Sequence, residues 1–205
     1  MSTQEPIIFI VDDDHASRES VRALVASMGL ATEDFPSAEE FLERYSPEMS
    51  GCLVTDLRMH GMSGLELQQR IVQQGWLLPT IILTGCADVP ATVELMQLGA
   101  VTVLEKPCRE MTLWDAIRKA LALEQDQRVG RRKELEIRSR VQSLTAQEAQ
   151  IMEMIVAGLP NKAIAIKLDI SLRTVEGRRK EVFRKLSAKS VAELVTLVKD
   201  AGQLS

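Results

Sequence analysis

Apolar and polar positions alternate regularly over the first 123 residues. Five short runs are rich in apolar residues, and a stretch with apolar residues at helical spacing follows each run. A wholly apolar run such as Ile7–Val11 is typical of a strand that is buried on both faces of a parallel sheet. We therefore predict a doubly wound α/β domain with a five-stranded parallel sheet, its strands at residues 7–11, 31–35, 52–55, 80–84 and 101–104.

Capping signals place the helices of this part between the strands. Ser37-Ala-Glu-Glu40 and Ser63-Gly-Leu-Glu66 are capping boxes, and glycines follow the helical stretches at positions 29, 75 and 99. We expect the last of these helices at residues 111–123.

A strongly charged segment comes next. Residues 124–140 hold ten charged residues among seventeen and no proline. Glu and Arg recur at i,i+4 spacing in the order that stabilises a helix, as the pairs Glu124/Arg128, Glu134/Arg138 and Glu136/Arg140. We expect residues 124–142 to form a helical linker that prolongs the preceding helix and can bend at Gly130. A flexible charged tether is the alternative.

The remaining residues, 143–205, contain the start signals of four helices, near Thr145, Asn161, Ser171 and Ser190. A tight turn at Asp169 joins the second helix to the third, which is rich in Arg and Lys and ends near Leu186. Two helices joined in this way are typical of a helix-turn-helix, so we predict an all-α DNA-binding domain.

Charge and composition support this division into two parts. The 205 residues carry a net charge of −4. Residues 1–123 contain 18 acidic and 9 basic residues (net −9), whereas residues 124–205 contain 11 acidic and 16 basic residues (net +5), which suits nucleic acid. The chain shows no signal peptide and no apolar run near the roughly 20 residues of a membrane span. Cys52, Cys86 and Cys108 match no disulfide or zinc pattern. We expect a cytoplasmic protein without a membrane partner.

Polar residues follow the predicted strands at the edge of the sheet where ligands bind in such folds. They are Asp12, Asp13 and Asp14 after the first strand, Asp56 after the third, Thr84 at the end of the fourth and Lys106 after the fifth. Mg²⁺ binds carboxylate oxygens, while a lysine and a threonine can hold phosphoryl oxygens. The pattern therefore predicts phosphoryl chemistry on a carboxylate. The simpler alternative is that the three aspartates only cap a helix.

Five motifs lie at these strand ends: Ile10-Val-Asp-Asp-Asp14, Thr55-Asp-Leu-Arg-Met59, Gly61-Met-Ser-Gly64, Leu83-Thr-Gly85 and Leu104-Glu-Lys-Pro107. Together they resemble the receiver domain of two-component response regulators, a flavodoxin-like fold. The resemblance implies that Asp56 is the phosphoacceptor and that a phosphohistidine on a sensor histidine kinase is the donor. It implies an Mg²⁺ (or Mn²⁺) site made by Asp12, Asp13, Asp56 and the backbone carbonyl of Arg58. It also implies that Thr84 and Lys106 bind the phosphoryl group and that the Lys106–Pro107 peptide is cis.

Three positions depart from the usual receiver pattern. His60 stands in place of Pro, and we expect it to loosen the loop after Asp56. Val103 occupies the switch position, where an aromatic ring is common, and a valine cannot swing inward as a ring does. Cys108 replaces a Phe and, with Cys86, flanks the site. We interpret both cysteines as small apolar residues, with redox sensing as the alternative.

The third helix of the second part has two distinct faces. At 100° per residue, Leu172, Val175, Val182 and Leu186 share one face, which we expect in the core. The opposite face carries Arg173, Gly177, Lys180 and Arg184, a pattern that lets a helix enter the major groove of DNA. A solvated basic face is the alternative.

This part also resembles a family, through Ser143-Leu-Thr-Ala-Gln-Glu148, Ala157-Gly-Leu159, Asn161-Lys-Ala-Ile-Ala165, Ser171-Leu-Arg-Thr-Val-Glu176 and Val182-Phe-Arg-Lys-Leu186. These motifs are similar to the LuxR/NarL-type four-helix DNA-binding domain, and the pairing with a receiver is most like the FixJ-type regulators. The resemblance implies base contacts by Glu176, Gly177 and Lys180. Arg179 lies nearer the core face of the helix, so we expect its stem to pack and its end to reach a phosphate. The full expected DNA-binding set is Arg173, Thr174, Glu176, Gly177, Arg179, Lys180 and Arg184.

The two resemblances together imply a transcription regulator, not an enzyme, with a receiver at residues 1–123 and a DNA-binding domain at residues 143–205. Phosphorylation would expose a dimer face around the fourth helix, fifth strand and fifth helix of the receiver. The dimer would bind duplex promoter DNA, and RNA polymerase is a further expected partner. The alternative from another class is an Mg²⁺-dependent phosphohydrolase of the haloacid-dehalogenase type, which also combines Asp, Thr and Lys on an α/β sheet.

Overall fold

The computed structural model describes residues 5–85 and 89–200. The chain divides into two compact units, one that ends at Arg128 and one that begins at Val129. Each unit has its own hydrophobic core. None of the helices in the two described ranges combines the length and apolar character needed to cross a bilayer.

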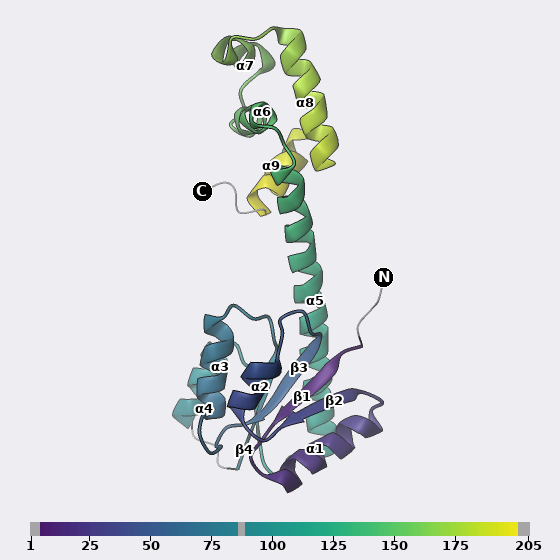
Figure 1. The fold of residues 1–205 in the computed structure, drawn as a ribbon, viewed down its shortest axis with the longest axis vertical. Helices are drawn as coiled ribbons and strands as arrows, with labels where there is room; N and C mark the ends of the chain where they lie inside the picture. The colour runs from purple at the N-terminus through teal and green to yellow at the C-terminus, as the bar shows by residue number, and fades with distance from the viewer. Residues whose placement is uncertain (1–4, 86–88, 201–205) are drawn as a thin grey trace. The chain divides into compact units, whose positions relative to one another are not determined.

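The first unit is a five-stranded parallel sheet with helices on both sides, which confirms the predicted fold class (Figure 1). The strands follow the order β2-β1-β3-β4-β5, and their bounds are β1 Ile7–Val11, β2 Ala31–Phe35, β3 Gly51–Asp56, β4 Thr80–Thr84 and β5 Thr102–Glu105. The helices are α1 His15–Ser27, α2 Ala38–Arg44, α3 Gly64–Gln73, α4 Val89–Gln97 and α5 Glu110–Gln142.

Successive residues of each strand point to opposite faces of this sheet. On β1, Ile8 and Ile10 pack with α1 and α5, whereas Phe9 and Val11 pack with α2 and α3. Ile82 of β4 packs with α4. This arrangement explains why the apolar runs are continuous, since both faces of each central strand are covered.

Two strands differ from the sequence prediction at their ends. β3 begins at Gly51, where a Cβ atom would lie 1.7 Å from the carbonyl oxygen of Ile7, so only a glycine can pair here. β5 covers residues 102–105 instead of 101–104. Val101 still donates a backbone hydrogen bond of 2.8 Å to Thr80, so the shift is one of assignment at a strand end.

Helix α5 is 33 residues long and contains the whole segment predicted to be a helical linker, including Gly130. Its first part is anchored in the first unit, because buried Glu124 accepts a 3.0 Å hydrogen bond from Ser50 Oγ and pairs with Arg128 at 3.4 Å. A further predicted pair, Glu136 and Arg140, is present at 2.7 Å.

Up to residue 200, where the described part of the chain ends, the second unit contains four further helices, as predicted: α6 Ala146–Val156, α7 Asn161–Leu168, α8 Leu172–Leu186 and α9 Val191–Asp200. The end of α5 joins their core through Val141. Asp169 lies between α7 and α8 with a φ of 52°, the left-handed conformation that the predicted tight turn needs. The prediction that Leu172 lies in the core is wrong. As the first residue of α8 it is 39% exposed, because the core contacts of this helix start at Val175.

Candidate functional sites

The carboxyl ends of β1, β3 and β5 bring Asp12, Asp56 and Lys106 together. Lys106 Nζ donates to Asp12 Oδ2 and to Asp56 Oδ1, each at 2.6 Å. The two carboxylates are 5% and 10% exposed, so they share one partly buried ammonium group. The parallel sheet thus places three of the predicted site residues in direct contact.

The charge of Lys106 is stabilised by these contacts. Burial lowers the pKa of the lysine, but its hydrogen bonds to Asp12 and Asp56 and their negative charges outweigh burial, so the pKa of Lys106 is raised. Lys106 therefore stays protonated at neutral pH. Its positive charge offsets the repulsion between two carboxylates that are both close to it.

Asp13 makes different contacts from its neighbour Asp12. Its Oδ2 accepts a 3.0 Å hydrogen bond from the backbone N–H of His60 and also contacts His60 Nδ1. The backbone bond is the main reason why the pKa of Asp13 is lowered. The expectation that His60 loosens the loop after Asp56 is therefore wrong, because His60 ties this loop to the end of β1.

The remaining predicted residues of the receiver site lie in the loop after β3 and on the neighbouring strands β4 and β5. The backbone N–H of Arg58 donates to Asp56 Oδ2 at 2.6 Å, and buried Thr84 accepts the backbone N–H of Lys106 through its carbonyl at 2.7 Å. The Lys106–Pro107 peptide is cis, as expected. Val103, at the expected switch position, is half-buried and packs against the cluster that contains Ile82.

Sequence reasoning missed two residues of this network. Ser17 Oγ donates to Asp12 Oδ2 at 2.6 Å and accepts from Lys106 Nζ at 3.0 Å. Arg18 Nη1 donates to the carbonyl of Asp12 at 2.6 Å. A signal was present, since Asp14 caps α1 through the N–H of Ser17 and the first turn of this helix therefore lies beside the strand ends. The helix-capping alternative thus holds for Asp14, whereas Asp12 belongs to the cluster.

The donor chemistry at this edge fits a divalent cation. Asp12 and Asp56 place two carboxylates against Lys106, Asp13 follows Asp12 directly in the chain, and Mg²⁺ prefers carboxylate oxygens. Within residues 5–85 and 89–200, no three Asp, Glu, His or Cys side chains are grouped as ready ligands. Lys106 bridges Asp12 and Asp56, and His60 holds Asp13, so these two residues compete with a cation for the same oxygens.

Of the two cysteines predicted to flank the site, Cys108 is half-buried and packs against the core of the first unit. Cys86 lies outside the described residues. Cys52 is fully buried in β3, where burial strongly raises the pKa of its thiol. Cys52 and Cys108 thus have the packing of small apolar residues.

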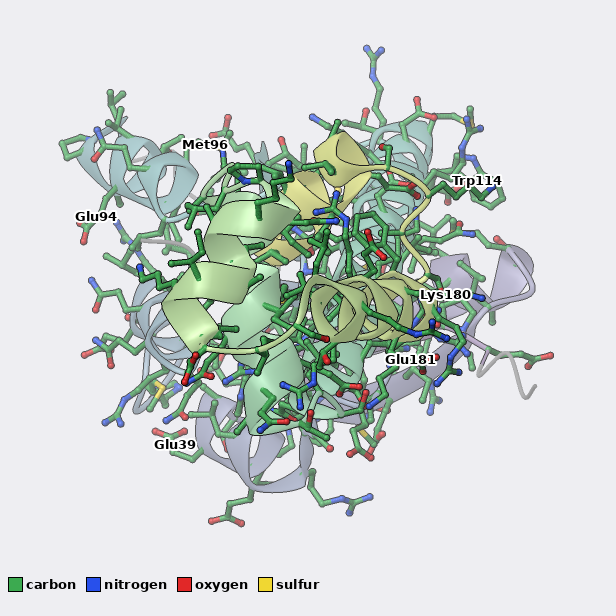
Figure 2. The ribbon with its side chains drawn as sticks, turned by 90° about the horizontal axis from the view of Figure 1, so that it is seen from above. Glu39, Glu94, Met96, Trp114, Lys180 and Glu181 are labelled. Atoms are coloured by element: carbon green, nitrogen blue, oxygen red, sulfur yellow. The ribbon has the colours of Figure 1, made fainter. Side chains whose placement is uncertain are left out.

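The predicted DNA-binding face lies on the outer side of α8. Arg173, Glu176, Gly177, Lys180 and Arg184 are all exposed, and Figure 2 shows Lys180 and the neighbouring Glu181 leaving this helix on its outer side. A Cβ atom at Gly177 would meet nothing within 4 Å. The outer face therefore offers three cations and an open, side-chain-free position between them.

Three residues of the expected DNA-binding set already have partners within the unit. Arg179 is half-buried, donates to Asn161 Oδ1 at 3.2 Å and lies 5.2 Å from the ring centre of Phe183. The hydroxyl of Thr174 lies 2.8 Å from that of Ser171, the residue that caps α8. Arg184 pairs with Glu181 at 2.7 Å, a contact that the sequence analysis did not anticipate.

Comparisons with known proteins agree on both units. Residues 8–118 match the response regulator receiver domain, and residues 142–198 match the bacterial regulatory proteins of the luxR family. The transcriptional regulatory protein FixJ of Bradyrhizobium diazoefficiens is 41% identical over 198 residues, which cover 97% of each chain. The response regulator protein TodT of Pseudomonas putida is 38% identical over 95% of this chain and 86% of its own length. Among solved structures, the response regulator StyR matches with a TM-score of 0.85 and 40% identity, over 95% of this chain and 98% of that one.

Proposed function

Because the chain belongs to the response regulators that join a receiver domain to a LuxR-type DNA-binding domain, we propose that Asp56 is its phosphoacceptor. Regulators of this family control transcription in response to phosphorylation. The observation that supports Asp56 is its position at the end of β3, 10% exposed and 2.6 Å from the ammonium of Lys106. An opposite charge at this distance can also hold the oxygens of an incoming phosphoryl group.

The roles of the surrounding residues follow from this assignment. A phosphohistidine of a sensor histidine kinase is the proposed donor, and its P–N bond breaks as a P–O bond to Asp56 forms. Lys106 and Thr84 hold the transferred group, and Val103 is the switch residue. Receiver domains bind Mg²⁺ at their acidic pocket. Here Asp12, Asp13, Asp56 and the carbonyl of Arg58 would hold it, and the cation would neutralise charge on the phosphoryl oxygens.

The output of the switch is proposed to be dimerisation and promoter binding. Val89, Val93 and Met96 form an exposed apolar stripe at helical spacing on α4, which suits contact with a second receiver. Residues 1–123 act as the receiver, residues 124–142 as the linker and residues 143–205 as the DNA-binding domain. RNA polymerase is the proposed further partner on the promoter.

For the DNA contacts we propose that α8 enters the major groove. Lys180, with Glu176 and Gly177, faces base edges, while Arg173 and Arg184 face phosphates. Thr174 lies near the start of the helix, where its backbone can approach the DNA. Arg179 contributes by holding α8 against α7 through its hydrogen bond to Asn161, and its proposed contact on DNA is a phosphate.

Labelling with a small phosphodonor and Mg²⁺ tests the central assignment. We expect one phosphoryl group per chain, none in Asp56→Asn, and a higher Mg²⁺ requirement in Asp13→Asn. Labelling that survives Asp56→Asn would contradict the assignment. Steady release of phosphate from phosphoesters, in place of a stoichiometric acyl phosphate, would favour the alternative phosphohydrolase of haloacid-dehalogenase type.

A further inference from the structure

The basic face of α8 contains an acidic residue that restrains one of its cations. Glu181 lies three residues before Arg184, so these two side chains are neighbours on the helix surface. Arg184 Nη2 lies 2.7 Å and Nε 2.9 Å from Glu181 Oε2. Nε therefore donates a hydrogen bond to this carboxylate oxygen, and Nη2 lies within ion-pair distance of the same atom.

This ion pair lies on the surface that the proposed function turns toward DNA. The side chains are 65% and 44% exposed, and pairs at such exposure contribute little to the stability of a fold. The hydrogen bond from Arg184 lowers the pKa of Glu181, which is therefore ionised at neutral pH. The pair therefore contributes little to the stability of the fold, and its position allows it to affect the binding of a charged ligand.

A DNA phosphate and Glu181 compete for the same guanidinium donors. If Arg184 turns to a phosphate, Glu181 loses its partner and is left as an anion close to the DNA backbone, where like charges repel. Each phosphate that a protein neutralises releases counterions and adds to binding that is independent of sequence. A restrained Arg184 adds less to this binding than an unpaired arginine would.

We propose that Glu181 competes with backbone phosphates for Arg184 and so limits binding to DNA of arbitrary sequence. The proposal rests on the proposed placement of α8 against DNA. It assigns to Glu181 a role in specificity, because weaker binding to random sites raises the ratio of the affinity for the operator to the affinity for competing DNA.

The test measures the affinity of the full chain for a random-sequence 30-base-pair duplex at several salt concentrations. Glu181→Gln keeps the shape of the side chain and removes its charge. We expect tighter binding and a log–log salt slope that is steeper by about 0.9, the value for one further phosphate contact. When the salt is lowered from about 200 to about 50 mM, the affinity of both proteins for DNA rises. The factor by which it rises should be roughly 3.5 times larger for the variant than for the wild type.

Two further variants make the test specific. Glu153→Gln removes the same charge at an exposed position of α6 and should leave the slope unchanged. Glu181→Gln combined with Arg184→Gln should lose the steeper slope, because the released cation is then absent. Three outcomes would overturn the role of Glu181. The salt slope could be unchanged in Glu181→Gln, it could change equally in Glu153→Gln, or it could stay steeper in the variant that also lacks Arg184. A wild-type protein that binds without salt dependence would overturn the placement of α8 as well.

Discussion

Lys106 is the residue on which the acidic site depends most directly. Its ammonium donates to Asp12, Asp56 and Ser17, so all three of its hydrogens have partners. The lysine occupies the space between two carboxylates that a cation would share. We therefore expect it to compete with a divalent cation for these oxygens in the absence of phosphate.

Replacement of Lys106 by Met should tighten divalent-cation binding to the unphosphorylated protein. Hydrogen bonds to charged groups contribute about 1.5–3 kcal/mol, so the gain should be roughly tenfold or more. Calorimetric titration with Mg²⁺ or Mn²⁺ measures it. Lys119→Met, at an exposed position of α5, is the matched control and should leave the affinity unchanged. Equal or weaker binding in Lys106→Met would show that the lysine does not compete.

Gly64 shows how closely the backbone packs around Asp56. A Cβ atom at this position would lie 2.2 Å from the carbonyl oxygen of Asp56. We expect Gly64→Ala to destabilise the first unit by about 1–3 kcal/mol, since backbone atoms must move. Urea unfolding followed by tryptophan fluorescence reports this unit, because Trp76 and Trp114 both belong to it. Gly85→Ala meets nothing within 4 Å and should change the midpoint little.

At the scale of elements, one ion pair joins the start of α6 to the end of α8. Thr145 and Glu148 form a complete capping box on α6. Glu148 also accepts a 2.6 Å hydrogen bond from Lys185 Nζ. One carboxylate thus caps its own helix and binds a second helix, which makes it a connection within the core of the second unit.

The pH dependence of stability should report this connection. The bond from Lys185, followed by the backbone bond from Thr145, lowers the pKa of Glu148 from its ordinary 4.5 to about 2. A carboxyl whose pKa is depressed on folding stabilises the fold above its unfolded pKa, and this contribution is lost as the pH falls. We expect the free energy of unfolding of the second unit to fall between pH 4.5 and pH 2 for this reason.

Glu148→Gln removes the titrating group and keeps a residue that can complete a capping box. We expect a loss of about 1–3 kcal/mol at neutral pH and a smaller decline toward acid. Chemical unfolding followed by circular dichroism over a pH series measures both. Glu153→Gln, exposed on the same helix, should retain the wild-type decline. If both variants behave alike, the Glu148–Lys185 pair does not govern the acid response.

At the scale of the whole molecule, the proposed dimer brings together two features of the receiver. The exposed stripe of α4 is available for a second chain, and Val103 cannot act as a swinging ring. With a weaker bias between the two states, we expect some dimer without phosphate and more dimer with beryllofluoride. Analytical ultracentrifugation of the full chain measures this, and a strictly monomeric unphosphorylated protein would contradict it.

Val93→Glu should weaken this dimer by roughly tenfold or more, because an unpaired carboxylate would be buried in the interface. Val72→Glu is the matched control, since Val72 on α3 is 47% exposed and Val93 is 49% exposed. We expect the control to dimerise like the wild type. An effect of equal size in both variants would place the interface elsewhere.

The sequence by itself determined the order of helices and strands, because the apolar patterns that predict each of them extend over only a few neighbouring residues. A wholly apolar strand such as Ile7–Val11, the capping box at Ser63 and the tight turn at Asp169 each act over a few residues, and the structure confirms each. The convergence of Asp12, Asp56 and Lys106 also followed from the sequence, since the carboxyl ends of parallel strands meet at one edge.

Only the tertiary structure decided how these residues pair. Ser17 in the lysine network, His60 bound to Asp13 and Glu124 anchored by Ser50 all join residues that are far apart in the chain. These contacts form only where the packed sheet and helices bring two side chains within about 3 Å of each other. The periodic pattern of the sequence gives no information on such distances. Glu181 and Arg184 are neighbours on one helix, yet the residue types alone did not decide which cation of this helix pairs with Glu181. The folded surface selected the pair on which the proposed control of DNA binding rests.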